Sequence, residues 1–166
     1  MAIINGTIFN DDGNTFLPLL GTGLADDMNA NWSLGNDLMM GFAGNDIYRI
    51  NSILDDIREI AGQGTDTVIT RNVSTTLKTN FENLTLDNTA GFLTALNGTG
   101  NSAANVITGN NNANILNGLS GNDTISAGGG NDTIIGGAGK DTMTDGGGSD
   151  TYDFNAVSES VVGVNR

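Results

Sequence analysis

Large apolar side chains recur at a fixed interval in the C-terminal part of the chain, between residues 118 and 153. This stretch divides into four units of nine residues, GLSGNDTIS, AGGGNDTII, GGAGKDTMT and DGGGSDTYD. The eighth position of each unit is large, and its residues are Ile125, Ile134, Met143 and Tyr152. A period of nine fits neither a helix nor a series of hairpins, and it is typical of a repeat architecture.

An aspartate stands two residues before each large side chain, and these aspartates are Asp123, Asp132, Asp141 and Asp150. The glycines before it permit a tight turn, because glycine adopts backbone angles that other residues avoid. The Thr-large-x segment after it predicts a short strand whose large side chain points inward. Two nine-residue units then form one coil, and stacked coils bring their strands to about 4.8 Å from one another.

This stacking places each carboxylate near the carboxylate two units further along the chain, beside the carbonyl oxygens of the turns. Carboxylate and carbonyl oxygens are the ligands that Ca²⁺ prefers. A single aspartate could equally serve only to stabilise its turn. Four units in register favour metal binding, because stacked carboxylates without a cation would repel one another.

The four units resemble the RTX repeat, G-G-x-G-x-D-x-U-x with U large and apolar, which binds calcium. The resemblance implies an all-β fold, a parallel β-roll that forms a right-handed β-solenoid with two repeats per coil and holds several Ca²⁺ ions between coils. One implied site joins the carbonyls of Leu119 and Gly121 and the Asp123 carboxylate to Gly136, Ala138 and Asp141. The next implied site joins Gly128, Gly130 and Asp132 to Asp145, Gly147 and Asp150.

The N-terminal half carries the same pattern less regularly. Its candidate ligands are Asp37, Asp46, Asp55 and Asp66. Insertions interrupt these units, so calcium binding and a simple turn role explain their aspartates equally well. The segment from Gly44 to Leu86 also resembles a longer RTX segment, which suggests wider coils that remain rich in strands.

Two units between these regions, GNSAANVIT and GNNNANILN, carry Asn105 and Asn114 where the later units carry aspartate. Their large positions are filled by the pairs Val106-Ile107 and Ile115-Leu116. We expect these coils to be mainly structural and joined by ladders of side-chain amides. The alternative is a mixed site, for instance between Asn114 and Asp132.

These patterns divide the chain into four parts. Residues 1–34 are expected to form an irregular N-terminal cap, because an open solenoid end exposes its core and its strand edge. Residues 35–99 form degenerate coils with a β-rich excursion, and residues 100–153 form the regular roll. Residues 154–166 resemble the start of a C-terminal cap, which leaves open whether the chain is part of a longer protein.

The composition narrows the range of possible functions and binding sites. The net charge is −13, and only three of the 19 acidic residues are glutamates. This charge opposes nucleic-acid binding, and aspartate favours turns and oxygen-rich sites over helices. The chain has no histidine and no cysteine, which removes the usual transition-metal ligands and the commonest general base. No apolar run is long enough to span a membrane. The carboxylates repeat in like surroundings, whereas catalytic pairs need unlike ones, so we do not expect an enzyme.

We therefore expect a secreted, extracellular or cell-surface calcium-binding module of bacterial type. It would fold on binding calcium, and it would stabilise an attached enzyme or toxin domain. Type I secretion is implied by the resemblance alone. Two other uses stay open: calcium-dependent self-assembly into a surface layer or fibre with its own copies, and an accessory module for extracellular polysaccharide of the alginate-epimerase type.

Overall fold

The structure, a computed structural model, describes residues 2–5, 19–29, 36–87 and 95–154. These residues form strands and no helix. In chain order the strands are β1 (Ala2–Asn5), β2 (Leu19–Leu20), β3 (Asp26–Asn29), β4 (Leu38–Met40), β5 (Ile47–Ile50), β6 (Asp56–Arg58), β7 (Thr67–Thr70), β8 (Thr75–Thr76), β9 (Asn83–Leu86), β10 (Gly98–Thr99), β11 (Val106–Thr108), β12 (Ile115–Asn117), β13 (Thr124–Ser126), β14 (Thr133–Ile135), β15 (Thr142–Thr144) and β16 (Thr151–Asp153).

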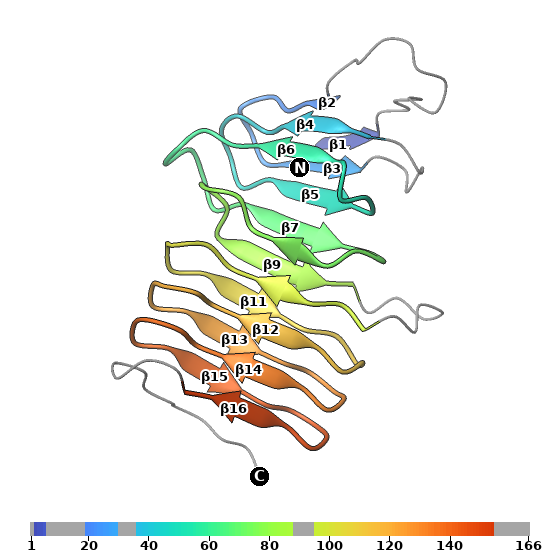
Figure 1. The fold of residues 1–166 in the computed structure, drawn as a ribbon. Coiled ribbons are helices and arrows are strands. Elements are labelled where there is room, and N and C mark those ends of the chain that lie inside the picture. Colours follow the sequence, from blue (N-terminus) through green and yellow to red (C-terminus); the bar gives the residue numbers. More distant parts are fainter. Residues whose placement is uncertain (1, 6–18, 30–35, 88–94, 155–166) are drawn as a thin grey trace.

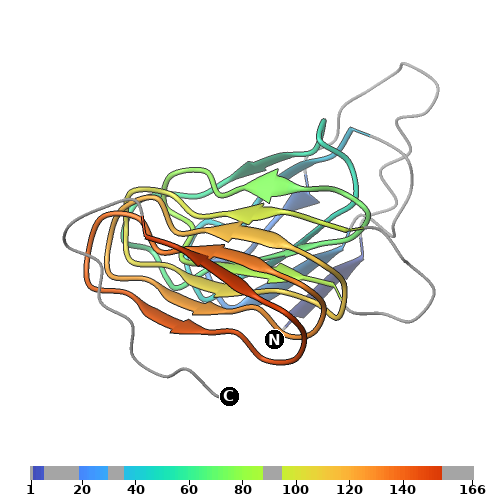
Figure 2. The same ribbon diagram turned by 60° about the horizontal axis from the view of Figure 1, so that its bottom comes forward.

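The strands alternate between two faces of a solenoid whose coils stack from the N-terminus to the C-terminus (Figure 1). The odd-numbered strands, β1 to β15, form one parallel sheet of eight strands. The even-numbered strands form a sheet of three, β2-β4-β6, and a sheet of five, β8-β10-β12-β14-β16. Figure 2 shows each coil as a flattened loop with one strand on each long side. The predicted all-β parallel roll is confirmed.

The register between coils follows the nine-residue repeat. Thr124 pairs with Thr142, and Ile134 pairs with Tyr152, so each residue faces its equivalent eighteen positions later. The spacing is less even earlier in the chain, where Ile47 pairs with Thr67, twenty positions later. The coils before residue 100 therefore have variable lengths, as the interrupted pattern predicts.

The core is a narrow column of large side chains, one from the middle of most strands. Eight of those in predicted large positions are 0 or 1% exposed, namely Met39, Tyr48, Val68, Ile107, Leu116, Ile125, Ile134 and Met143. Tyr152, at the last predicted large position, is only partly buried. Thr and Ile fill these short strands because branched side chains suit a pleated surface. The core widens around Phe81, whose ring packs edge-on against Tyr48 at 5.0 Å between centroids.

The region expected to be an irregular N-terminal cap contributes three parallel strands in its described part. Met28 in β3 is fully buried and pairs with Tyr48 of β5. Asp26, Asp27 and Met28 do not alternate between polar and apolar residues, so periodicity alone predicts no strand here, and β3 lies in the sheet because it pairs with β1 and β5. The role of 1–34 as a cap stays a prediction, and residues 6–18 and 30–35 lie outside the described part. In the range 154–166 only Phe154 is described.

Candidate calcium sites

Three aspartates of the regular coils are buried at the edge of the solenoid, directly before a strand. Asp123, Asp132 and Asp141 precede β13, β14 and β15 and are at most 1% exposed. The Oδ1 atom of Asp141 accepts the backbone N–H of Asp123 at 2.9 Å, and Asp150 accepts that of Asp132 at 2.8 Å. Each carboxylate thus joins its own coil to the preceding one.

The second oxygen of these carboxylates has no such partner. The Oδ2 atoms of Asp123, Asp132 and Asp141 are buried and accept no hydrogen bond. A buried charge without a partner is strongly unfavourable. A Cβ on Gly118 would collide with Asp123 Oδ2 and with the carbonyl oxygen of Gly136, so glycine leaves open the space on which these two oxygens converge. This oxygen-only environment fits a Ca²⁺ ion.

The turn carbonyls predicted as ligands lie in the same stacked turns, and several already accept hydrogen bonds between coils. The carbonyl oxygen of Leu119 accepts the N–H of Ala138 at 2.9 Å. The carbonyl oxygen of Ala138 in turn accepts the N–H of Gly121 at 2.9 Å. In the next pair of turns, Gly128 accepts the N–H of Gly147 at 2.8 Å. A carbonyl oxygen has two lone pairs, so these bonds leave one free for a cation.

The remaining predicted ligands of this region are Gly130, Asp145 and Gly147, and each has a contact in the structure. The carbonyl of Gly147 accepts the N–H of Gly130 at 2.8 Å, as Ala138 does in the other turn. The carbonyl of Gly130 lies against Gly148 of the next coil. The Asp145 side chain accepts the N–H of its neighbour Gly146 at 2.9 Å. Metal binding by all of these residues stays a prediction.

Burial raises the pKa values of two carboxyls in the regular coils, those of Asp123 and Asp132. The pKa of Asp123 rises to about 6, first through loss of solvent and then through the charge of Asp141, although the hydrogen bond from Asn105 lowers it. Burial also raises the pKa of Asp132, with a smaller contribution from Asp150. Without a cation, Asp123 and Asp132 therefore hold a proton more tightly than an exposed aspartate does, and a bound cation would lower their pKa values again.

The asparagine coils keep the same backbone contacts but satisfy their side chains internally. Asp132 Oδ1 accepts the N–H of Asn114 at 2.8 Å, as in the aspartate coils. The Asn114 amide donates to the carbonyl of Leu96 at 2.7 Å and accepts the N–H of Asn110 at 3.0 Å. Asn105 likewise donates to the carbonyls of the preceding coil. These contacts agree with the predicted structural role.

The ladder of acidic side chains continues through the N-terminal coils. Asp46 Oδ1 accepts the N–H of Asp26 at 2.7 Å, and Asp66 Oδ1 accepts that of Asp46 at 2.8 Å. Glu82 takes the next place, because its Oε2 accepts the N–H of Asp66 at 2.8 Å. Asp26 and Glu82 were not among the predicted site residues. Both stand two residues before a core side chain, which is the signal that would have identified them.

Asp37 and Asp55 lie along the opposite edge and differ in their contacts. Asp55 accepts the N–H groups of Asp37, Asn51 and Ser52, each at 3.1 Å, so both of its oxygens are bonded. A turn-stabilising role accounts for these contacts. Asp37 is buried and neither of its oxygens has a partner. Burial, followed by the charge of Asp55, raises the pKa of Asp37 to about 6.

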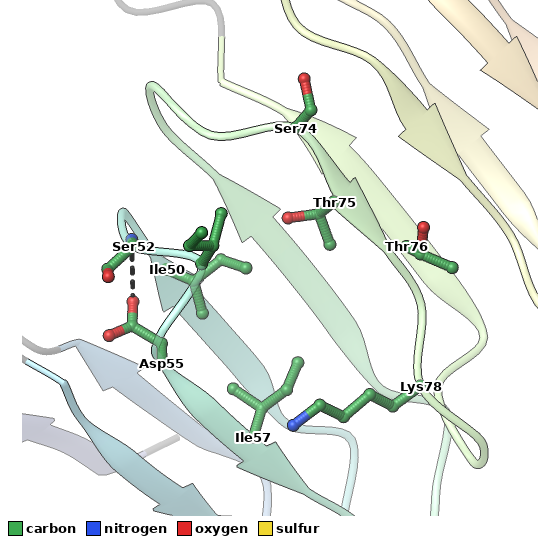
Figure 3. A pocket seen from close by; sticks show the side chains of 9 residues that line it. Ile50, Ser52, Asp55, Ile57, Ser74, Thr75, Thr76 and Lys78 are labelled. Carbon is green, nitrogen blue, oxygen red and sulfur yellow. Dashed lines mark hydrogen bonds between the residues drawn. The ribbon is translucent and has the colours of Figure 1, made fainter.

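A pocket of about 210 Å³ opens where β6 and β8 separate (Figure 3). Lys78, after β8, closes one part of the gap with an ion pair to Asp56 at 2.7 Å. The side chains around it come from Ile50, Ser52, Ile53, Asp55, Ile57, Ser74, Thr75, Thr76 and Lys78. None is aromatic, so the pocket offers no ring on which a sugar could stack.

One protein-family model matches the chain, that of the RTX calcium-binding nonapeptide repeat, in four copies. The matches cover residues 33–49, 99–134 and 126–156. They include the asparagine coils, the aspartate coils and the turn between β4 and β5. The RTX resemblance is confirmed. No curated protein and no solved structure gives a significant match. None of the described residues belongs to a helix that could cross a membrane.

Proposed function

Since the chain carries RTX calcium-binding nonapeptide repeats, we propose that it is a secreted module whose β-roll completes its folding when calcium binds between the coils. One observation carries this proposal: Asp123, Asp132 and Asp141 each have a buried oxygen without a partner. The nearby described cation, Lys140, is exposed and forms no ion pair among the described residues. A divalent cation would satisfy these oxygens and bind one coil to the next.

The energetics favour folding that depends on calcium. Ordering each residue costs about 1–2 kcal/mol of backbone entropy, and glycine-rich turns lose the most. The narrow core of one large side chain per strand offsets only part of this cost. Calcium that binds the folded coils but not the unfolded chain adds its binding free energy to folding.

Export would exploit this dependence. In a cytosol with little free calcium, the segment 118–153 would stay unfolded, which suits secretion of an unfolded chain by the type I route. Outside the cell, millimolar calcium matches the weak affinity of extracellular modules. The carboxylates would act in binding and not in catalysis, because each has the surroundings of the next.

Circular dichroism with and without a calcium chelator tests the proposal. In chelator we expect the β signal of 118–153 to be missing, and we expect a cooperative gain as calcium approaches about 1 mM. The double variant Asp123→Asn/Asp141→Asn should lose most of this response, whereas Asp153→Asn, which removes one exposed charge, should keep it. A spectrum that is the same with chelator and with calcium would contradict the proposal.

The other two uses have less support. The pocket between β6 and β8 lacks the aromatic residues that a polysaccharide-binding module would use. Self-assembly through the ends of the roll would make particle size depend on calcium, which light scattering would detect. We therefore favour a stabilising module, joined to an enzyme or toxin domain.

A further inference from the structure

Three acidic side chains from different elements meet at one edge of the N-terminal coils. Asp46 precedes β5, Glu59 follows β6 and Asp66 precedes β7. One carboxylate oxygen from each lies within 4.8 Å of the other two. Two oxygens on opposite sides of a Ca²⁺ ion are about 4.6–5.2 Å apart, so one ion could contact all three carboxylates.

An unpartnered buried oxygen points into this cluster. Asp46 is 1% exposed, and its Oδ2 accepts no hydrogen bond. A Cβ on Gly41 would collide at once with Asp46 Oδ2, Glu59 Oε1 and the Tyr48 hydroxyl. These oxygens therefore converge on one point that only glycine leaves open.

Tyr48 positions Glu59 at this point. Its ring is fully buried, and its hydroxyl accepts the N–H of Gly41 at 2.6 Å and donates to Glu59 Oε1. Glu59 Oε2 accepts the N–H of Ile60 at 3.1 Å, which orients the other end of the carboxylate. The carboxylate is thus held in place from two sides.

No basic side chain neutralises the cluster among the ion pairs of the described residues. Arg49 pairs with Asp27, Arg71 pairs with Asp87, and both Arg58 and Lys78 pair with Asp56. Three carboxylates thus share a partly buried space without a counter-charge. A hard divalent cation supplies this charge with the oxygen coordination that the cluster offers.

We propose that Asp46, Glu59 and Asp66 bind one Ca²⁺ ion through side-chain carboxylates alone. This site differs from the nonapeptide sites, which combine one carboxylate per turn with backbone carbonyls. Glu59 is its distinctive ligand, because it comes from the end of β6, outside any nonapeptide turn. The ion would join the coil of β5 and β6 to the coil that begins with β7.

Terbium luminescence can isolate this site, because Tb³⁺ replaces Ca²⁺ and emits when a nearby tyrosine or tryptophan is excited. The chain has two tyrosines and one tryptophan. In the background Trp32→Phe/Tyr152→Phe of this chain, only Tyr48 can sensitise emission. We expect a saturable signal from Tb³⁺ that Ca²⁺ displaces more effectively than Mg²⁺. The variant Asp123→Asn/Asp141→Asn should retain this signal.

Glu59→Gln in that background should weaken Tb³⁺ binding by at least about tenfold, because affinity follows the number of charged ligands. Asp56→Asn removes the same charge three residues earlier and should leave the affinity unchanged. If Glu59→Gln does not fold, Glu59→Asp replaces it, and withdrawal of the carboxylate should weaken binding several-fold. Unchanged Tb³⁺ affinity in the Glu59 variants would overturn the site. Absence of any Tyr48-sensitised signal would also overturn it, and would indicate that protons neutralise the cluster. Either result would leave the calcium response of 118–153 intact.

Discussion

The asparagine coils and the aspartate coils have the same backbone arrangement, but their buried polar side chains differ in whether they find hydrogen-bond partners. In both, an Oδ1 atom of the later coil accepts a backbone N–H of the earlier one, at 2.8 Å for Asn105 and 2.9 Å for Asp123. The amides of Asn105 and Asn114 also donate to carbonyls of the preceding coil. A carboxylate has no N–H to donate to those carbonyls, and the Oδ2 atoms of Asp123, Asp132 and Asp141 accept no hydrogen bond.

This difference shows how the charge of the aspartate side chain changes what the coil needs in order to be stable. A neutral amide supplies its own donors, so the side chains of an asparagine coil are satisfied by protein atoms alone. The described part of a carboxylate coil has no positive partner for these oxygens, and under the proposed function its folding depends on an ion. The asparagine coils lie between the N-terminal coils and the aspartate coils, and they can provide a stacking surface on which β13 to β16 form when calcium arrives.

The largest expected effect comes from truncating the core in each kind of coil. With calcium present, Leu116→Ala and Ile134→Ala should each lower the free energy of unfolding by about 2–5 kcal/mol, because both side chains are fully buried. Without calcium, Leu116→Ala should keep its effect, whereas Ile134→Ala should lose most of it because its coil is not formed. Urea denaturation in both buffers measures this.

Ile115→Ala is the matched control for that pair. Ile115 is 48% exposed beside the buried Leu116, so its truncation should change stability by less than about 0.5 kcal/mol. Equal losses for Ile134→Ala with and without calcium would show that the aspartate coils do not need the ion.

Exchanging asparagine and aspartate between the two kinds of coil should change the stability of the calcium-free protein by a smaller amount. The change should have opposite signs in the two directions of exchange. Asn114→Asp removes the donor to Leu96 and adds a buried charge, so the calcium-free protein should lose about 1–3 kcal/mol. Calcium should recover part of that loss. Asp132→Asn should instead stabilise the calcium-free protein and reduce the calcium effect. Thermal unfolding with chelator and with calcium measures both variants, and a loss of stability for Asp132→Asn in chelator would contradict the comparison.

The smallest effect is a dependence on pH that the asparagine coils should lack. The pKa of Asp123 is raised to about 6, from an ordinary value near 3.8. The folded state therefore binds a proton more tightly than the unfolded chain, so the calcium-free protein should gain stability as the pH falls from about 6 to about 4. Protons should compete with calcium over the same range. Denaturation in calcium-free buffer at pH 7 and pH 5 checks the sign, and lower stability at pH 5 would contradict it.

The nine-residue pattern predicted the roll because each position has one task. Glycine makes the turn, aspartate precedes the strand, and the next residue but one enters the core. The pattern could not decide between adjacent large residues such as Val106 and Ile107. Pairing with the neighbouring strands decided that Ile107 is fully buried and Val106 is half exposed. The nine-residue pattern also did not identify Asp26 and Glu82 as site residues, because the residues before them lack the glycines of a complete unit.

The sequence alone determined the repeat, its period and the aspartates at its turns, because a short repeat prescribes the same local conformation each time. Only the tertiary structure decided which carboxylate oxygens are left without partners and that Glu59 reaches Asp46 and Asp66. Those relations depend on coils of unequal length stacking on one another, and the distance between atoms of different coils is not encoded in any single repeat.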